Sequence, residues 1–175
     1  MMVIGAHAAD FVWRAGGALA LSSEGGGAAA VLALSYGERG ESGELWKEEG
    51  QTIERVKAVR AAEASRAAAA LGAEFQCLDL GDYPLEIDGD ALGLIADRIR
   101  EFAPDVLVTH TDTDPFNPDH PVASALAQPA LGGAKQRLPL KVLPDLPAGI
   151  AGIPAGLTAA RGNKLPAWSR IERVS

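Results

Sequence analysis

The sequence contains three histidines, and two of them, together with one aspartate, form a set typical of a metal site. His7 follows the first apolar run, His110 ends a later one, and His120 comes ten residues further on. Asp10 lies three residues after His7, close enough for both side chains to face one point where a strand turns into a helix. Two histidines and one carboxylate leave coordination positions open for water or substrate, which suits catalytic Zn²⁺ and, less distinctively, other divalent cations. We therefore expect His7, Asp10 and His120 to bind a metal ion.

The elements that must position these residues alternate between two kinds of pattern. Short apolar runs predict four β-strands, at Met2–Ala6, Ala30–Tyr36, Phe75–Leu80 and Asp105–His110. Segments with apolar residues at helical spacing or with helix-end signals lie between them and predict helices at Phe11–Glu24, Gln51–Leu71 and Asp88–Phe102. This alternation implies right-handed crossovers between parallel strands. We expect a doubly wound α/β fold, with a mostly parallel sheet and helices on both faces.

This fold brings all three histidines to one edge of the sheet. In the commonest doubly wound strand order the first and fourth strands are neighbours, and ligands bind in the crevice at their carboxyl ends. One histidine near a strand end is usually a structural hydrogen-bonding residue, but three histidines that converge make that interpretation weaker. No Gly-x-Gly-x-x-Gly or P-loop pattern follows the first strand, which argues against a dinucleotide or ATP enzyme.

A glycine-rich loop after the second predicted strand carries further charged side chains. It contains Arg39 and five glutamates: Glu38, Glu41, Glu44, Glu48 and Glu49. These residues could supply a general acid or base and a clamp for an anion. They could equally form a solvated loop and the start of a helix, where acidic residues are favoured by the helix dipole. The residue pattern alone does not choose among the glutamates.

Composition excludes several classes of protein. The chain has 175 residues, of which 47% are hydrophobic and 22% charged, so it can form a hydrophobic core. Its net charge of −7 argues against the basic surface that binding to nucleic acids or anionic membranes requires. The single cysteine, Cys77, excludes an internal disulfide. No apolar run reaches the roughly 18 residues of a membrane-spanning helix, and the first residues lack the basic region of a signal peptide. We expect a soluble cytoplasmic protein, with homo-oligomerisation left open.

The charge changes sign near residue 123. Residues 1–122 contain 9 of the 16 basic and 21 of the 23 acidic residues, a net charge of −12, whereas residues 123–175 have a net charge of +5 and six of the eleven prolines. We expect two parts: a metal-binding α/β domain at 1–122, and an irregular, poorly ordered, Pro-rich segment at 123–175. Leu138–Leu143 could form one more strand. The segment is either a Pro-rich tail or, the interpretation we favour, unrelated sequence that has replaced the C-terminal part of the domain.

The motifs of residues 1–122 resemble those of the PIG-L/LmbE metal-dependent superfamily. The shared motifs are Ala6-His7-Ala8-Ala9-Asp10, Gly16-Gly17, Gly37-Glu38, Arg60-Ala61-Ala62-Glu63, Leu71-Gly72 and Pro118-Asp119-His120, in the superfamily's order. The best-known members are zinc-dependent N-deacetylases of amino sugars, and the resemblance assigns the metal-ligand positions to His7, Asp10 and His120. Two positions depart from the deacetylase pattern: Ala9 stands where a general-base aspartate is expected, and Asn117 where a histidine commonly steadies the oxyanion.

Within this superfamily the chain is most similar to the 4-oxalomesaconate hydratases. The likeness extends over Met2–Arg14, with alanine in the base position, over Leu34–Gln51, and over Thr109–Val122. It implies a zinc-dependent hydro-lyase that adds water to a tricarboxylic oxo acid in bacterial gallate and protocatechuate degradation, with Glu48 as acid or base. A small polycarboxylate substrate of this kind could bind the metal through two oxygens and contact Arg39 and Asn117, although Arg39 could instead pair with nearby glutamates. His110 is either a further contact of the substrate or a partner that orients the metal ligands.

Three functions remain open from the sequence. The first is the metal-dependent hydratase, the second a zinc-dependent N-deacetylase, against which Ala9 argues, and the third a truncated metal-binding relative without catalytic activity. The third gains weight because relatives are expected to have another catalytic histidine beyond the Pro-Asp-His-Pro motif, and this chain has no histidine after His120.

Overall fold

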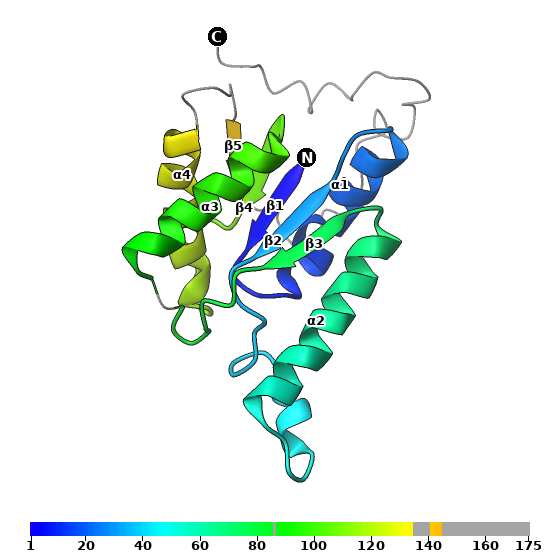
Figure 1. The fold of residues 1–175 in the computed structure, drawn as a ribbon, viewed down its shortest axis with the longest axis vertical. Helices are drawn as coiled ribbons and strands as arrows, with labels where there is room; N and C mark the ends of the chain where they lie inside the picture. The colour runs from blue at the N-terminus through cyan, green and yellow to red at the C-terminus, as the bar shows by residue number, and fades with distance from the viewer. Residues whose placement is uncertain (86, 135–140, 145–175) are drawn as a thin grey trace.

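The computed structural model describes residues 1–85, 87–134 and 141–144, which form a sheet of five parallel strands. In chain order the strands are β1 (Met2–Gly5), β2 (Ala30–Ala33), β3 (Glu74–Cys77), β4 (Val106–Thr109) and β5 (Lys141–Pro144). Their order across the sheet is β3-β2-β1-β4-β5, so β1 lies between β2 and β4 (Figure 1). The predicted doubly wound sheet is therefore confirmed, including the neighbouring first and fourth strands on which the predicted site depends.

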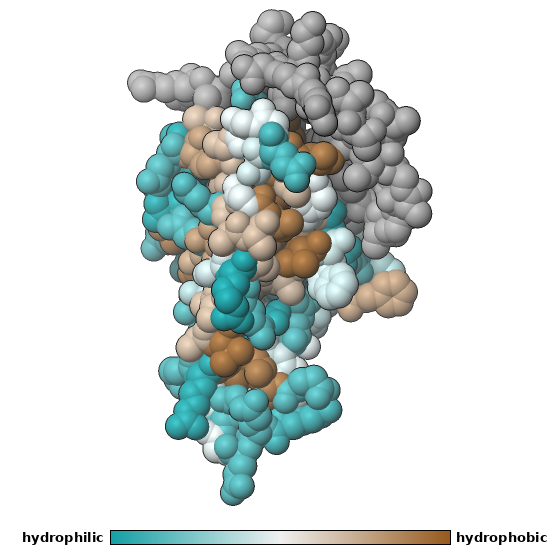
Figure 2. Space-filling model, turned by 90° about the vertical axis from the view of Figure 1, so that its right-hand side faces the viewer, coloured by the Kyte–Doolittle hydropathy of each residue, from teal (hydrophilic) through white to brown (hydrophobic). Residues whose placement is uncertain are grey.

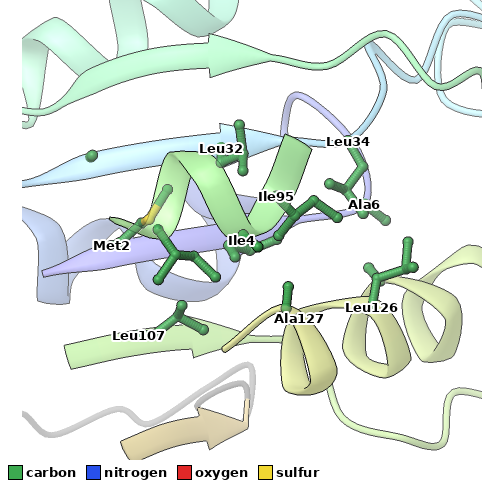
Figure 3. Close-up of a cluster of buried hydrophobic side chains, with 14 of the residues drawn as sticks. Met2, Ile4, Ala6, Leu32, Leu34, Ile95, Leu107, Leu126 and Ala127 are labelled. Carbon is green, nitrogen blue, oxygen red and sulfur yellow. The ribbon is translucent and has the colours of Figure 1, made fainter. Parts of the chain in front are cut away.

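Among the described residues, four α-helices cover the two faces of the sheet, and a short 3₁₀ helix lies in a loop. They are α1 (Asp10–Glu24), η1 (Leu45–Lys47), α2 (Ile53–Ala70), α3 (Gly89–Phe102) and α4 (Asp119–Ala134). Because strand side chains alternate between faces, Val3 and Val31 pack with α1 and α2, whereas Ile4 and Leu32 pack with α3 and α4. Figure 3 shows this second core, with Ile95 of α3 and Leu126 of α4 facing the sheet. A fully buried Leu or Ile contributes about 1.5–3 kcal/mol to stability.

The ends of the elements follow their sequence signals. The Thr52 hydroxyl accepts a hydrogen bond from Arg55 N–H at the start of α2, and the Asp88 carboxylate caps α3 in the same way. After α2, Gly72 adopts a left-handed φ of 68°, which a residue with a side chain adopts only with strain. All three predicted helices form within two residues of the expected starts and one residue of the expected ends.

Helix α4 corrects the expectation of irregular structure from residue 123 onward. It continues to Ala134, so the predicted boundary between residues 122 and 123 falls inside a helix. Ala123, Leu126, Ala127 and Ala130 recur at helical spacing and are buried against α3 and the sheet. Their burial stabilises the helix although Pro129 removes one hydrogen-bond donor. Proline content alone predicts irregular structure here, but burial of this apolar face outweighs the cost of the proline and stabilises the helix.

The extra strand predicted at Leu138–Leu143 is present as β5, which pairs with β4 at Lys141–Pro144. Residues 135–140 and 145–175 lie outside the described ranges, and with them the remaining part of the predicted irregular segment. Within the described ranges, every helix is too short or too polar to cross a bilayer. Figure 2 shows that the lower end of the molecule, where the loop before α2 lies, carries mostly hydrophilic side chains.

Candidate metal centre

The carboxyl ends of β1 and β4 bring together the residues that the sequence singled out. His7 lies two residues after β1, Asp10 is the first residue of α1, His110 directly follows β4, and His120 is the second residue of α4. The structure adds Glu41, from the loop between β2 and α2. One ligand atom from each of His7, Asp10, Glu41 and His120 lies within 4.8 Å of the others. These four residues are the candidate metal centre.

His7 is buried, and its two ring nitrogens face different partners. Nε2 lies 3.1 Å from Asp119 Oδ2, whereas Nδ1 lies 3.2 Å from Glu41 Oε1 and 3.6 Å from Asp10 Oδ2. Burial lowers the pKa of the imidazole, but the carboxylates of Asp10 and Glu41 outweigh burial and raise it to about 10. The surroundings of His7 therefore strongly favour a positive charge.

His120 is oriented in the same manner. Its Nδ1 lies 2.7 Å from Asp114 Oδ2, and its Nε2 lies 3.4 Å from Asp10 Oδ1. The pKa of Asp114 falls to about 2, because the backbone N–H of Phe116 and the His120 ring both bond to its carboxylate. Asp114 is thus ionised at any physiological pH and fixes the ring of His120.

Asp10 connects the strand, the helix and the third histidine. Its Oδ2 accepts a hydrogen bond from His7 N–H at 2.7 Å and lies 3.0 Å from His110 Nε2. Burial would raise the pKa of Asp10, but its contacts with His110, His120 and His7 hold the pKa well below the ordinary value. The carboxylate is therefore charged, and its Oδ1 faces His120.

The residues present fit a divalent cation. Among the residues that the structure describes, the buried atoms His7 Nδ1 and His120 Nε2 have no aligned hydrogen-bond partner. Both point toward the Asp10 carboxylate, while the opposite nitrogen of each ring faces Asp119 or Asp114. A carboxylate behind each histidine is the arrangement that orients metal-ligating imidazoles. Two imidazole nitrogens and one or two carboxylates suit Zn²⁺.

Glu41 is the residue that sequence reasoning did not single out. Its side chain is 25% exposed, and Asn117 Nδ2 donates a hydrogen bond to its Oε1 at 3.5 Å. The loop turns sharply at Gly37, where φ is 68° and a Cβ would lie 3.3 Å from the Cβ atoms of both His7 and Glu41. A glycine at that point of the sequence is the one local signal of this close approach.

The loop that carries Glu41 is fastened to the segment after β3. The carboxylate of Asp82, which is fully buried, accepts hydrogen bonds from Arg39 N–H at 3.0 Å and from Gly40 N–H at 2.7 Å. The Arg39 guanidinium also donates to the Asp82 carbonyl at 3.1 Å. Arg39 is therefore an exposed residue of this loop, two residues before Glu41, with its guanidinium directed to the segment after β3.

The other predicted site residues lie at different depths. His110 is 2% exposed and stacks on the His120 ring with centroids 4.0 Å apart, a position that favours a role in orienting the ligands over a contact with substrate. Asn117 lies between Glu41 and the Asp119 backbone N–H, to which its Oδ1 is an acceptor at 3.1 Å. Glu48, at the end of η1, is exposed and accepts a hydrogen bond from Gln51 at 3.3 Å; it is not one of the four clustered residues.

Known proteins resemble this chain in sequence and in fold. The model of the family described as PIG-L, GlcNAc-PI de-N-acetylase, matches residues 2–131. A 4-oxalmesaconate hydratase of Pseudomonas putida is 50% identical over 129 residues, 74% of this chain and 50% of that protein. The crystal structure of GalB, a 4-carboxy-2-hydroxymuconate hydratase from Pseudomonas putida, is likewise 50% identical, covers 74% of this chain and 54% of its own, and superposes with a TM-score of 0.72.

More distant structures share the fold. An N,N′-diacetylchitobiose deacetylase from Pyrococcus horikoshii is 22% identical, with a TM-score of 0.67, over 75% of this chain and 48% of that chain. The chain spans about half the length of the curated relative that it matches. Residues 2–131, which the family model matches, include all four residues of the candidate metal centre.

Proposed function

Because the chain belongs to the GlcNAc-PI de-N-acetylase (PIG-L) family, we propose that it acts as a metal-dependent hydratase, adding water across the double bond of 4-oxalomesaconate in bacterial gallate and protocatechuate degradation. The observation that carries this proposal is the 50% identity to a hydratase over 129 residues. A deacetylase is the weaker candidate, because Ala9 has no proton-accepting group where that chemistry is expected to have a carboxylate.

We propose Zn²⁺ as the metal, bound by His7 Nδ1, Asp10 and His120 Nε2, with Glu41 as a fourth carboxylate at the exposed side. When bound, such a cation supplies positive charge beside the oxo group of the substrate and favours the enolate that water addition requires. The chain itself supplies orientation. Asp119 and Asp114 hold the outer nitrogens of the two imidazoles, so that the inner nitrogens face one point.

Proton transfer is the role we propose for Glu48. Its carboxylate is exposed on the hydrophilic loop before α2, where it can exchange protons with water, and the proposed role requires this loop to bring the carboxylate to the bound substrate. The exposed Arg39 guanidinium, on the loop that carries Glu41, is the group we propose to pair with a distal substrate carboxylate, together with the Asn117 amide beside Glu41. Glu41 and Glu48 would thus have separable functions, the first in metal binding and the second in turnover.

The test measures zinc content and 4-oxalomesaconate hydration on the same protein samples. We expect Glu48→Gln to lower kcat at least about 100-fold with zinc affinity unchanged, as is typical of a lost general acid or base. Glu49→Gln is the matched control, because its side chain is the exposed neighbour in the same loop. Glu41→Gln should instead weaken zinc binding.

Three other outcomes would contradict the proposal. Acetate release from an N-acetylated amino sugar, without hydration of the oxo acid, would make the chain a deacetylase. Bound zinc without turnover of either substrate would make it a non-catalytic metal-binding relative. Equal activity of Glu48→Gln and Glu49→Gln would remove Glu48 from the reaction.

A further inference from the structure

Tyr83 lies beside the candidate metal centre although no sequence motif pointed to it. Its ring stacks on the His7 imidazole, with centroids 5.6 Å apart and planes inclined by 16°. Its backbone N–H donates to Asp119 Oδ2 at 2.8 Å, the same oxygen that His7 Nε2 approaches. The tyrosine is therefore joined to His7 both through the ring and through Asp119.

The backbone at Tyr83 is strained. Its φ is 47°, in the left-handed region that bulky residues rarely occupy. Such a conformation persists where surrounding contacts hold it, and here both Asp119 oxygens accept hydrogen bonds from this segment, from Tyr83 N–H and from Leu85 N–H at 3.0 Å. The strain and the two hydrogen bonds together place the ring against His7.

Gly40, on the loop before α2, leaves the space that the tyrosine ring occupies. A Cβ at Gly40 would lie 2.0 Å from Tyr83 Cε2 and 2.1 Å from Cδ2, far inside van der Waals contact. The adjacent Asp82 holds Gly40 N–H at 2.7 Å, so the loop cannot easily move away from the ring. The ring, which is 38% exposed, thus lies against both the His7 imidazole and the Gly40 backbone.

A second contact on His7 is needed for a geometric reason. The contact from Nε2 to Asp119 fixes one atom of the imidazole, but the ring can still turn about its Cβ–Cγ bond, because Nδ1 has no aligned hydrogen bond to Glu41 or Asp10 that would hold it. A flat ring packed nearly parallel to the imidazole restricts that rotation. His120, on another side, is tilted by 53° and does not restrain the plane in this way.

We propose that Tyr83 is a positioning residue of the metal centre: its ring, which lies against His7 and Gly40, sets the plane of the His7 imidazole and so directs Nδ1 at the metal. The proposal rests on metal binding by His7, as proposed above, and not on the hydratase reaction. It assigns the function to the ring alone. The phenolic oxygen is not required, so phenylalanine should substitute for tyrosine.

The experiment measures zinc affinity by competition with a chromophoric chelator, and the visible spectrum of the Co²⁺-substituted protein, which reports ligand geometry. Tyr83→Phe should keep both properties within about threefold of the original. Tyr83→Ala should weaken zinc binding about 5- to 20-fold, near the lower end of the roughly 10- to 100-fold effect of losing a partner of a metal ligand, and should change the Co²⁺ spectrum. A merely structural role would lower the unfolding temperature without a change in that spectrum.

Gly40 provides an independent test that leaves Tyr83 in the sequence. Gly40→Ala should displace the ring and weaken zinc binding as much as Tyr83→Ala does. Gly43→Ala in the same loop is the matched control, because a Cβ there meets no atom within 4 Å. The double variant Tyr83→Ala/Gly40→Ala should bind zinc no more weakly than Tyr83→Ala, since the ring through which Gly40 acts is already gone.

Two results would overturn the proposal. Unchanged zinc affinity and Co²⁺ spectrum in a folded Tyr83→Ala protein would show that the ring does not position His7. Additive losses of zinc affinity in the double variant would show that Gly40→Ala does not act through the Tyr83 ring. Full zinc affinity in His7→Ala would show that His7 is not a metal ligand. These measurements do not depend on whether the protein has hydratase activity.

Discussion

Asp119 links the metal ligand His7 to the segment after β3, and its replacement by asparagine tests that connection. The carboxylate is 1% exposed and faces three groups: His7 Nε2 at 3.1 Å and Tyr83 N–H at 2.8 Å at Oδ2, and Leu85 N–H at 3.0 Å at Oδ1. The asparagine side chain would have one oxygen and one NH₂ group in place of the two carboxylate oxygens. In either orientation of the amide, the NH₂ group faces either the buried N–H of Leu85 or the partly buried N–H of Tyr83, which then has no acceptor.

The expected loss of stability follows from the one N–H group that is left without an acceptor. One buried unsatisfied donor costs about 1–3 kcal/mol, so Asp119→Asn should lower the free energy of unfolding of the metal-free protein by that amount. The loss of the carboxylate behind His7 should weaken zinc binding about 10- to 100-fold. Urea unfolding followed by circular dichroism measures the first quantity, and chelator competition on the same samples measures the second.

Asp112→Asn is the control, because Asp112 is exposed on the neighbouring loop and its carboxylate accepts a hydrogen bond from the Thr113 hydroxyl. That variant should change stability by less than about 0.5 kcal/mol. If Asp119→Asn is no more destabilising than Asp112→Asn and binds zinc within about threefold of the original protein, the assignment of Asp119 as the partner of His7 is wrong.

Two further predictions concern glycines and pH. Gly72→Ala should lower the free energy of unfolding by about 1–3 kcal/mol, because φ is 68° there and a Cβ would lie 1.9 Å from Ser23 Oγ. Gly93→Ala should instead raise the free energy of unfolding by up to about 1 kcal/mol, because a Cβ there, on the exposed side of α3, meets nothing within 4 Å. Equal effects of the two substitutions in urea unfolding would refute both predictions. Without a bound cation the pKa of His7 is about 10, above its unfolded value near 6.5, so its stabilising contribution is complete below about pH 6.5 and is lost as pH rises through 10. Zinc must displace the proton on His7, so the apparent Kd for zinc should decrease about tenfold per pH unit between pH 7 and 9. Calorimetry in buffers of different ionisation enthalpy should detect one released proton. A pH-independent Kd would contradict the assignment of His7 as a metal ligand.

Local patterns in the sequence determined the framework of this protein. Strand and helix alternation predicted the doubly wound sheet, and that topology alone predicted that His7, Asp10 and His120 meet at the carboxyl ends of β1 and β4. These predictions succeed because hydrophobic periodicity and the handedness of crossovers act over short stretches of chain. The same local reasoning failed at α4, because proline content predicted irregular structure whereas burial of an apolar face against α3 stabilises a helix.

The tertiary structure decided which groups complete the centre. Five glutamates share one loop, and Glu41 reaches His7 because Asp82, 42 residues beyond Gly40, accepts that loop's N–H groups. Tyr83 contacts His7 across a separation of 76 residues, and Asp119 does so across 112. Loop conformation at these points depends on hydrogen bonds and packing between segments far apart in the chain, and such contacts leave no periodic signal in the sequence. The sequence could thus predict the histidines at strand ends, whereas the residues that orient them are defined only by the folded chain.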